Sequence, residues 1–219
     1  MQQKKYFTIG QAIKRIRNGE ISSSYNLLGG DSFLEDFFIN ELSGKFCDNK
    51  PTKIHFSMDQ DSIENLFLEL SSISLFKDKK IIVVREIKKI RSENARMELL
   101  GLLNKMNKNI VLVIISEDFD VNNKFIKKIS NLSEVLDCRT PFEKDIKKWV
   151  EYIVKRKNIK ISNILIDKYI DTYGDSIAHI INEIEKDALF IGIDNEIVDF
   201  DYNNSYNGGR EYHLWHLQD

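Results

Sequence analysis

The longest apolar runs of the chain predict the strands of a parallel sheet. The core of Lys80–Arg85 and the whole of Ile110–Ile115 are continuously apolar and mostly β-branched. Strands that are covered on both faces have this composition, whereas strands with one face in water alternate apolar and polar residues. Further strands are predicted at Ser24–Leu28, Thr52–Ser57 and Glu134–Cys138.

Helical patterns fill the gaps between these strands. In the first pattern, Phe33, Phe37, Phe38 and Leu42 recur at helical spacing, so we expect them to form its buried face, with Asp31 and Ser32 as candidate N-caps. Because strand and helix alternate up to about residue 138, the sequence predicts a doubly wound α/β domain. The predicted helices are Phe33–Phe46, Ser62–Ile73, Glu93–Lys105 and Asn122–Ile129.

The pattern changes after Thr140-Pro141, where a proline follows a residue that it biases away from helix. Helices without any intervening strand are predicted at Phe142–Lys157, Ser162–Tyr173 and Ser176–Phe190. We therefore expect an α/β domain over residues 1–140 and a small helical domain over residues 141–198. Residues 199–219 are expected to be a polar linker that leads into the first turn of a further, missing domain.

Composition excludes several classes of protein. The chain carries 32 Lys and Arg against 34 Asp and Glu, so any contact with nucleic acid has to come from local patches. No apolar run reaches the length of a membrane span, and we expect a cytoplasmic protein with no membrane partner. Cys47 and Cys138 form no metal-binding pair and are predicted to be buried, reduced thiols.

The position of a phosphate-binding loop lacks the residues that such a loop needs. After the strand Ser24–Leu28 the chain reads Gly29-Gly30-Asp31-Ser32, with no lysine to neutralise phosphate. The Gly44-Lys45 pair lies at the far end of the following helix. We therefore expect no nucleotide cofactor, no metal and no catalytic residue.

Two large apolar residues stand beside a strongly charged stretch. Leu75 and Phe76 are followed directly by Lys77-Asp78-Lys79-Lys80. One interpretation is an exposed anchor for a protein partner, because aromatic anchors carry much of the affinity of protein interfaces. The other is that both side chains cap the core of the domain.

The same stretch begins a basic run. Between residues 77 and 91 the acidic side chains are Asp78 and Glu86. The run could attract DNA or an acidic partner, or it could be a solvated rim. Its basic residues are Lys77, Lys79, Lys80, Arg85, Lys88, Lys89 and Arg91.

In order along the chain, these motifs resemble the delta subunits of bacterial DNA polymerase III clamp loaders. A strand leads into Gly29–Phe33 in place of a phosphate loop, and Ser74-Leu75-Phe76 precedes basic residues and the strand Ile81–Glu86. Glu183–Leu189 resembles the late helix of the second domain of the family, and Trp215–Asp219 resembles the entry to the third. The resemblance covers essentially the whole chain.

The resemblance implies a RecA-like AAA+ module with a parallel sheet, followed by a small helical lid, neither of which binds ATP productively. It further implies a subunit of the DNA polymerase III holoenzyme that binds and opens the sliding clamp without catalysis of its own. Ser71 stands where many clamp-binding motifs of the family carry Gln. The clamp-binding residues implied by the resemblance are Ser71, Ile73, Ser74, Leu75 and Phe76.

The resemblance also implies partners beyond the clamp. The other loader subunits would bind through the missing C-terminal collar domain, and primer-template DNA would be contacted indirectly. The candidate residues for a contact with DNA or with an acidic partner are Lys77, Lys79, Lys80, Lys88, Lys89 and Arg91. Two alternatives remain open: a degenerate nucleotide-binding protein and a DNA-binding module.

Overall fold

The computed structural model describes residues 6–47, 52–72, 79–117, 119, 122–174, 176–192 and 196–197. The chain divides into two compact units, which meet between Thr140 and Pro141. The first unit holds a six-stranded sheet and the second is mainly helical.

The sheet of the first unit is entirely parallel, with the strand order β1-β6-β2-β5-β4-β3. Every residue of β5 is buried, as are the four central residues of β4, which explains their continuous apolar runs. The predicted strands are confirmed, except that β5 ends one residue later than predicted and β6 one residue earlier. The strands are β1 (Phe7–Thr8), β2 (Ser24–Leu28), β3 (Thr52–Ser57), β4 (Lys80–Arg85), β5 (Ile110–Ser116) and β6 (Glu134–Asp137).

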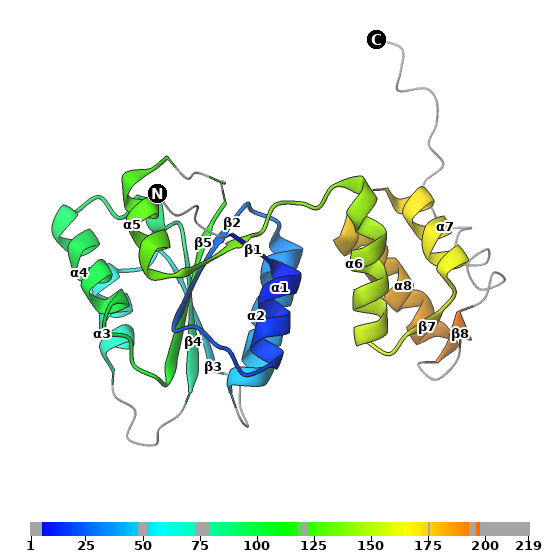
Figure 1. The fold of residues 1–219 in the computed structure, drawn as a ribbon, viewed down its shortest axis with the longest axis horizontal. Helices are drawn as coiled ribbons and strands as arrows, with labels where there is room; N and C mark the ends of the chain where they lie inside the picture. Colours follow the sequence, from blue (N-terminus) through cyan, green and yellow to red (C-terminus); the bar gives the residue numbers. More distant parts are fainter. Residues whose placement is uncertain are drawn as a thin grey trace, which may run out of the picture. The chain divides into compact units, whose positions relative to one another are not determined.

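Helices cover both faces of this sheet. In Figure 1, α1 (Ile9–Arg17) and α2 (Ser32–Phe46) lie on one face, and α3 (Ile63–Ser71), α4 (Glu93–Leu103) and α5 (Lys124–Leu132) lie on the other. This arrangement confirms the prediction of a doubly wound α/β fold. Since the strands are parallel, the helices that follow them all begin at the carboxyl edge of the sheet.

Side-chain caps fix where these helices begin. Asp31, Ser62, Ser92 and Asn123 each accept a hydrogen bond from a backbone N–H in the first turn of the helix that follows. The helix α3 ends at Ser71, so it is shorter than predicted. The predicted end, Ile73, lies outside the described residues.

The buried face of α2 differs from the predicted one. Phe38 and Leu42 are buried, but Phe33 and Phe37 are only partly buried and stack on each other with ring centroids 6.3 Å apart. The face that packs on the sheet is therefore rotated from the aromatic stripe and includes a charged residue. Its members are Leu34, Glu35, Phe38, Ile39, Leu42, Ser43 and Phe46.

The first strand and helix were not predicted from the sequence. Thr8 caps α1 in a reciprocal capping box with Gln11, in which each side chain bonds to the backbone of the other residue. The buried positions of α1 follow helical spacing: Ile9, Ala12, Ile13 and Ile16.

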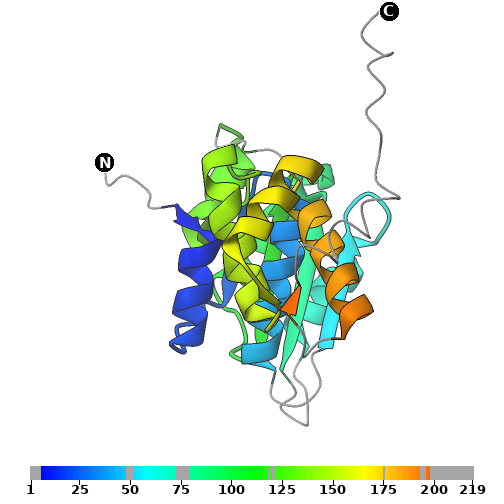
Figure 2. The ribbon, with the colours of Figure 1, turned by 90° about the vertical axis from the view of Figure 1, so that its right-hand side faces the viewer.

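The second unit contains α6 (Glu143–Arg156), α7 (Asn163–Tyr173) and α8 (Ile177–Ile191), each of which packs on the other two (Figure 2). Ile146, Ile153, Tyr169, Ile180 and Ile184 are fully buried between them. The prediction that this unit has no strand is wrong. Two short strands, β7 (Lys160–Ile161) and β8 (Glu196–Ile197), pair in parallel, and two residues are too few to give a visible pattern.

Within the described ranges, none of the helices has both the length and the apolar character needed to cross a membrane.

Candidate functional site

The turn between β2 and α2 is bonded tightly to the neighbouring strands. The Gly29 N–H donates to the Ser116 carbonyl at the end of β5, at 3.1 Å. Past the end of β6, the Cys138 N–H donates to the Leu28 carbonyl at 2.7 Å, and the Asp31 N–H donates to the Cys138 carbonyl at 3.0 Å. The turn is thus bonded on both sides to the carboxyl edge of the sheet.

The two glycines of this turn are required by close backbone approaches. A Cβ on Gly29, whose φ is +138°, would lie 2.3 Å from the Arg139 nitrogen. A Cβ on Gly30, whose φ is +81°, would lie 2.6 Å from the Glu117 carbonyl oxygen. Both angles also disfavour any residue with a side chain. Glycine is therefore required at both positions of this turn.

The first turn of α2 is capped by a carboxylate of the chain itself. The Asp31 carboxylate accepts the Leu34 N–H at 3.0 Å, so it occupies the positive end of the helix where a phosphate would bind. The N–H groups of Gly29 and Asp31 are already bonded to backbone carbonyls. The sequence lacks a phosphate-binding lysine, and the geometry adds a second obstacle to phosphate binding.

A buried ion pair lies at the same edge of the sheet. Glu35 on α2 is 1% exposed, and its Oε2 lies 2.8 Å from Nη1 of Arg85, the last residue of β4. Burial raises the pKa of the Glu35 carboxyl above its ordinary value of 4.5, and Arg85 opposes this shift. Arg85 belongs to the predicted basic run, and its pairing with Glu35 was not predicted from the sequence.

Both cysteines are buried and neither forms a disulfide, which confirms their prediction as buried, reduced thiols. Burial raises the pKa of the Cys138 thiol far above its ordinary value, so this thiol is unreactive. Among the described residues, no three His, Cys, Asp or Glu side chains are grouped so that they could hold a metal ion.

A hydrogen-bonded tie joins the end of α3 to the start of β4. The Lys80 Nζ donates to Glu69 Oε2 at 2.5 Å and to Ser72 Oγ at 2.6 Å. The Ser72 hydroxyl in turn donates to the Glu69 carbonyl at 2.9 Å. We call Glu69, Ser72 and Lys80 the α3–β4 tie.

Most of the candidate clamp-binding residues lie between Ser72 and Lys80 in the sequence. Ser71 is exposed at the end of α3, and one turn earlier Leu68 exposes 69% of its surface. The other apolar residues of α3 pack toward the core: Leu66 and Leu70 are buried, and Ile63 and Phe67 are partly buried. Outside the described residues are Ile73, Ser74, Leu75, Phe76 and Lys77.

The structure divides the predicted basic run between two edges of the sheet. Lys79 and Lys80 lie at the start of β4, whereas Lys88, Lys89 and Arg91 follow its end. At about 3.3 Å per residue, the strand separates the two groups by roughly 17 Å. They cannot act as one continuous patch.

The second group meets basic residues that the sequence analysis did not single out. The short helix η1 (Ile87–Lys89) leads into α4, where the Glu93 carboxylate lies 3.7 Å from Arg96 Nη1 and 3.9 Å from Lys128 Nζ of α5. The exposed side of α5 therefore adjoins the start of α4. We call the combined set the α4–α5 basic surface: Lys88, Lys89, Arg91, Arg96, Lys124, Lys127 and Lys128.

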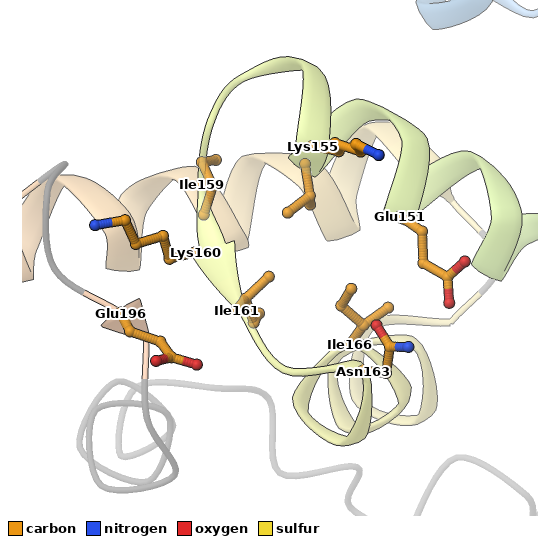
Figure 3. Close-up of a pocket in the computed structure, with 9 residues that line it drawn as sticks. Glu151, Lys155, Ile159, Lys160, Ile161, Asn163, Ile166 and Glu196 are labelled. Atoms are coloured by element: carbon orange, nitrogen blue, oxygen red, sulfur yellow. The ribbon is translucent and has the colours of Figure 1, made fainter.

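A shallow hollow of about 500 Å³ lies in the second unit, between α6, β7, the start of α7 and β8. Figure 3 shows Lys160 and Glu196 at one end and Glu151 and Asn163 at the other. Charges of both signs face solvent here, with no grouping that indicates chemistry. The apolar residues that line the hollow are Val154, Ile159, Ile161 and Ile166.

The strand order, with helices on both faces of the sheet, defines a class of fold, the RecA-like AAA+ type. Solved structures agree with this class. The Bacillus subtilis DNA clamp loader delta protein matches with a TM-score of 0.67 at 15% identity, over 90% of this chain and 62% of that one. The Thermotoga maritima RuvB Holliday junction branch migration motor matches with a TM-score of 0.54 at 10% identity, over 91% and 67%.

Comparison of the sequence with known proteins identifies the family of the chain. Residues 25–139, more than half of the chain, match the family described as DNA polymerase III, delta subunit. The chain therefore belongs to the DNA polymerase III delta subunit family. The DNA polymerase III subunit delta of Buchnera aphidicola subsp. Schizaphis graminum is 31% identical in an alignment of 164 residues that covers 66% of this chain and 45% of that relative. The chain thus corresponds to less than half of the relative's length.

Proposed function

We propose that this chain binds the replicative sliding clamp and favours its open form during clamp loading, without hydrolysing ATP itself. The main support is the family match over residues 25–139, which includes the segment with Leu75 and Phe76. A partner shifts a ring between closed and open forms only by binding one form more tightly. Burying two large apolar side chains supplies about 1.5–3 kcal/mol each toward that difference.

The clamp surface in this proposal continues from Leu75 and Phe76 back to the exposed end of α3. Ser71 and Leu68 are exposed on α3, and the core packing of this helix is made by its other apolar residues. Residues 1–140 would supply the clamp contact and residues 141–198 the lid. Residues 199–219 would lead toward the collar domain that binds the other loader subunits. The direct test is surface plasmon resonance of this chain on the immobilised clamp of the same organism, in which saturable binding is expected.

The nucleotide part of the proposal has a separate test. We expect titration calorimetry with ATP and Mg²⁺ to show no binding at micromolar affinity, because the N–H groups of Gly29 and Asp31 are occupied within the chain. Phosphate release should stay at background. Magnesium-dependent release that disappears when Asp31 or Ser32 is replaced would contradict this part and favour a degenerate nucleotide hydrolase.

A direct contact with DNA is a second candidate function, favoured by the α4–α5 basic surface. Cations spaced along a helix and over its neighbour suit the phosphate backbone. Replacing both Lys127 and Lys128 by alanine should lower the slope of log affinity against log salt by about 2, roughly one for each lysine. Filter binding to duplex DNA at several salt concentrations measures this slope. An unchanged slope would remove these lysines from any DNA contact.

A further inference from the structure

We infer that Arg139 is a positioning residue for the second unit: it fixes the end of the first unit from which the chain leaves, and so narrows the range of orientations that the second unit can adopt. The two units divide between Thr140 and Pro141, directly beyond this arginine. This role is independent of the clamp contact proposed above, because every residue that carries it belongs to the end of the first unit and the connector.

Backbone bonds hold the chain up to the residue before Arg139. Past the end of β6, the Cys138 N–H donates to the Leu28 carbonyl and the Cys138 carbonyl accepts the Asp31 N–H. The next nitrogen, that of Arg139, lies so close to Gly29 that a Cβ on this glycine would approach it to 2.3 Å. The chain therefore brings Arg139 to a defined position against the turn between β2 and α2.

Two contacts of different kinds hold the Arg139 side chain. Its Nε donates to Asp137 Oδ1 at 2.9 Å and its Nη2 donates to Asp137 Oδ2 at 2.6 Å, which is a bidentate pair of fixed geometry. The Arg139 backbone N–H also donates to Asp137 Oδ1, at 3.2 Å. The guanidinium carbon lies 4.2 Å from the ring centroid of Phe119, within the range of a cation–π contact. The side chain is thus held both from β6 and from the segment that follows β5.

The ring on which the guanidinium lies has a second aromatic neighbour. The ring centroid of Tyr6, the residue before β1, is 5.5 Å from that of Phe119, with an interplanar angle of 53°. Tilted aromatic pairs at this separation attract each other. We call Tyr6, Phe119, Asp137 and Arg139 the Arg139 latch.

The connector beyond the latch is short and stiff. Thr140 and Phe142 are exposed, and Pro141 has no N–H to donate. The ring of the proline fixes its own φ and biases Thr140 toward extended backbone. The second unit begins at once, because the Asp145 N–H donates to the Phe142 carbonyl at the start of α6. Few soft torsions therefore separate the units, and releasing Arg139 adds its φ and ψ to them.

The test is the distance between the units in the full chain, measured by double electron–electron resonance with spin labels at Asn131→Cys in α5 and Asn182→Cys in α8. Both positions are exposed, whereas the native Cys47 and Cys138 are buried, so the labels attach at the introduced thiols. In Arg139→Ala the distance distribution should broaden about 1.2-fold, because the spread of a flexible connector grows with the square root of its length, which rises from about two residues to about three.

Trypsin gives an independent readout, since it cuts after arginine and a protease acts on the open form of a segment. Asp137→Ala, which removes the acceptor of the guanidinium, should speed cleavage after Arg139 several-fold and broaden the distance distribution as much as Arg139→Ala does. The matched control is Asp167→Ala, which removes an exposed acid whose Oδ2 lies 2.7 Å from Lys147 Nζ in the second unit. This control should change neither readout.

The melting temperature and a double variant separate positioning from a general contribution to stability. The Arg139 side chain is 55% exposed, and exposed ion pairs contribute little to stability, so each variant should melt like the parent. The double variant Asp137→Ala/Arg139→Ala should broaden the distance distribution no more than either single change, because both remove the same interaction.

Two results would overturn the positioning role. One is a distance distribution that stays unchanged in both Arg139→Ala and Asp137→Ala. The other is a broadening that Asp167→Ala reproduces, or that comes with a lower melting temperature, because the loosening would then be general. Clamp binding enters neither readout, so this role and the proposed function can fail separately.

Discussion

Replacing Leu75 and Phe76 together by alanine should lower the affinity for the sliding clamp at least about tenfold and leave the melting temperature almost unchanged. Truncating an aromatic or aliphatic anchor at an interface typically costs ~2 kcal/mol or more, and 1.4 kcal/mol corresponds to a factor of ten. The charged stretch Lys77–Lys80 directly after the pair favours an exposed anchor. The measurements are surface plasmon resonance on the clamp and a thermal melt.

The competing interpretation, a cap on the core, predicts the opposite pattern. Core truncations of this size destabilise by several kcal/mol, because they remove apolar contacts and leave cavities. Leu66→Ala is a suitable reference for that outcome, since Leu66 is fully buried on α3. Met97→Ala, at an exposed position of α4, is the reference for an apolar surface residue that lies outside the proposed interface. A double variant that melts like the parent and binds the clamp equally well would remove this segment from the mechanism.

Arg85→Met should lower the free energy of unfolding by about 3 kcal/mol at neutral pH. Removing one member of a buried pair leaves the other charge without a partner, at a typical cost of ~3–5 kcal/mol. The lower end applies because the Arg85 side chain is 37% exposed and Glu35 can escape its charge by taking up a proton. Urea denaturation at neutral pH measures the loss. The double variant Glu35→Leu/Arg85→Met should recover most of it, because no unpaired charge is left buried.

The pH dependence of this effect has a definite sign. The pKa of Glu35 is raised in the folded protein, so folding favours the protonated form, and this group's contribution to stability is lost as pH rises from about 4.5 through the raised pKa. Without Arg85 the pKa rises further. The difference between Arg85→Met and the parent should therefore shrink as the pH falls toward 4.5. If Arg85→Met loses the same free energy of unfolding at neutral pH and near pH 4.5, the ionised Glu35 carboxylate is not the cause of the loss.

The sheet could be predicted from the sequence because burial on both faces leaves an unmistakable apolar run, as in β4 and β5. The first helix could also have been found, since Ile9, Ala12, Ile13 and Ile16 follow a Thr8-x-x-Gln11 capping box. The strands β1, β7 and β8 could not, because two residues show no alternation.

For the site, the sequence showed which residues were missing more clearly than it showed contacts. The absence of a lysine after Leu28 can be read from the sequence. The hydrogen bonds of Gly29 to the end of β5, and of Asp31 to the residue after β6, can be known only from the fold. The pairs Glu35–Arg85 and Glu69–Lys80 join different elements, which no local pattern reveals. Glu35 left one signal, since it lies one helical turn before Phe38 and Ile39 on the face that packs inward.

The pairing of β1 with β6 gives the first unit a mechanical property. Phe7 lies beside Leu136 and Thr8 beside Asp137, so the strand by which the chain enters this sheet is the neighbour of the strand by which it leaves. Because the two strands are parallel, the entering and leaving ends emerge at opposite edges of the sheet. A pull between these ends loads the pair in shear, along the strands, and its backbone bonds have to yield together instead of unzipping in turn. A pull between these ends would therefore act first on the two-residue pairing of β1 with β6.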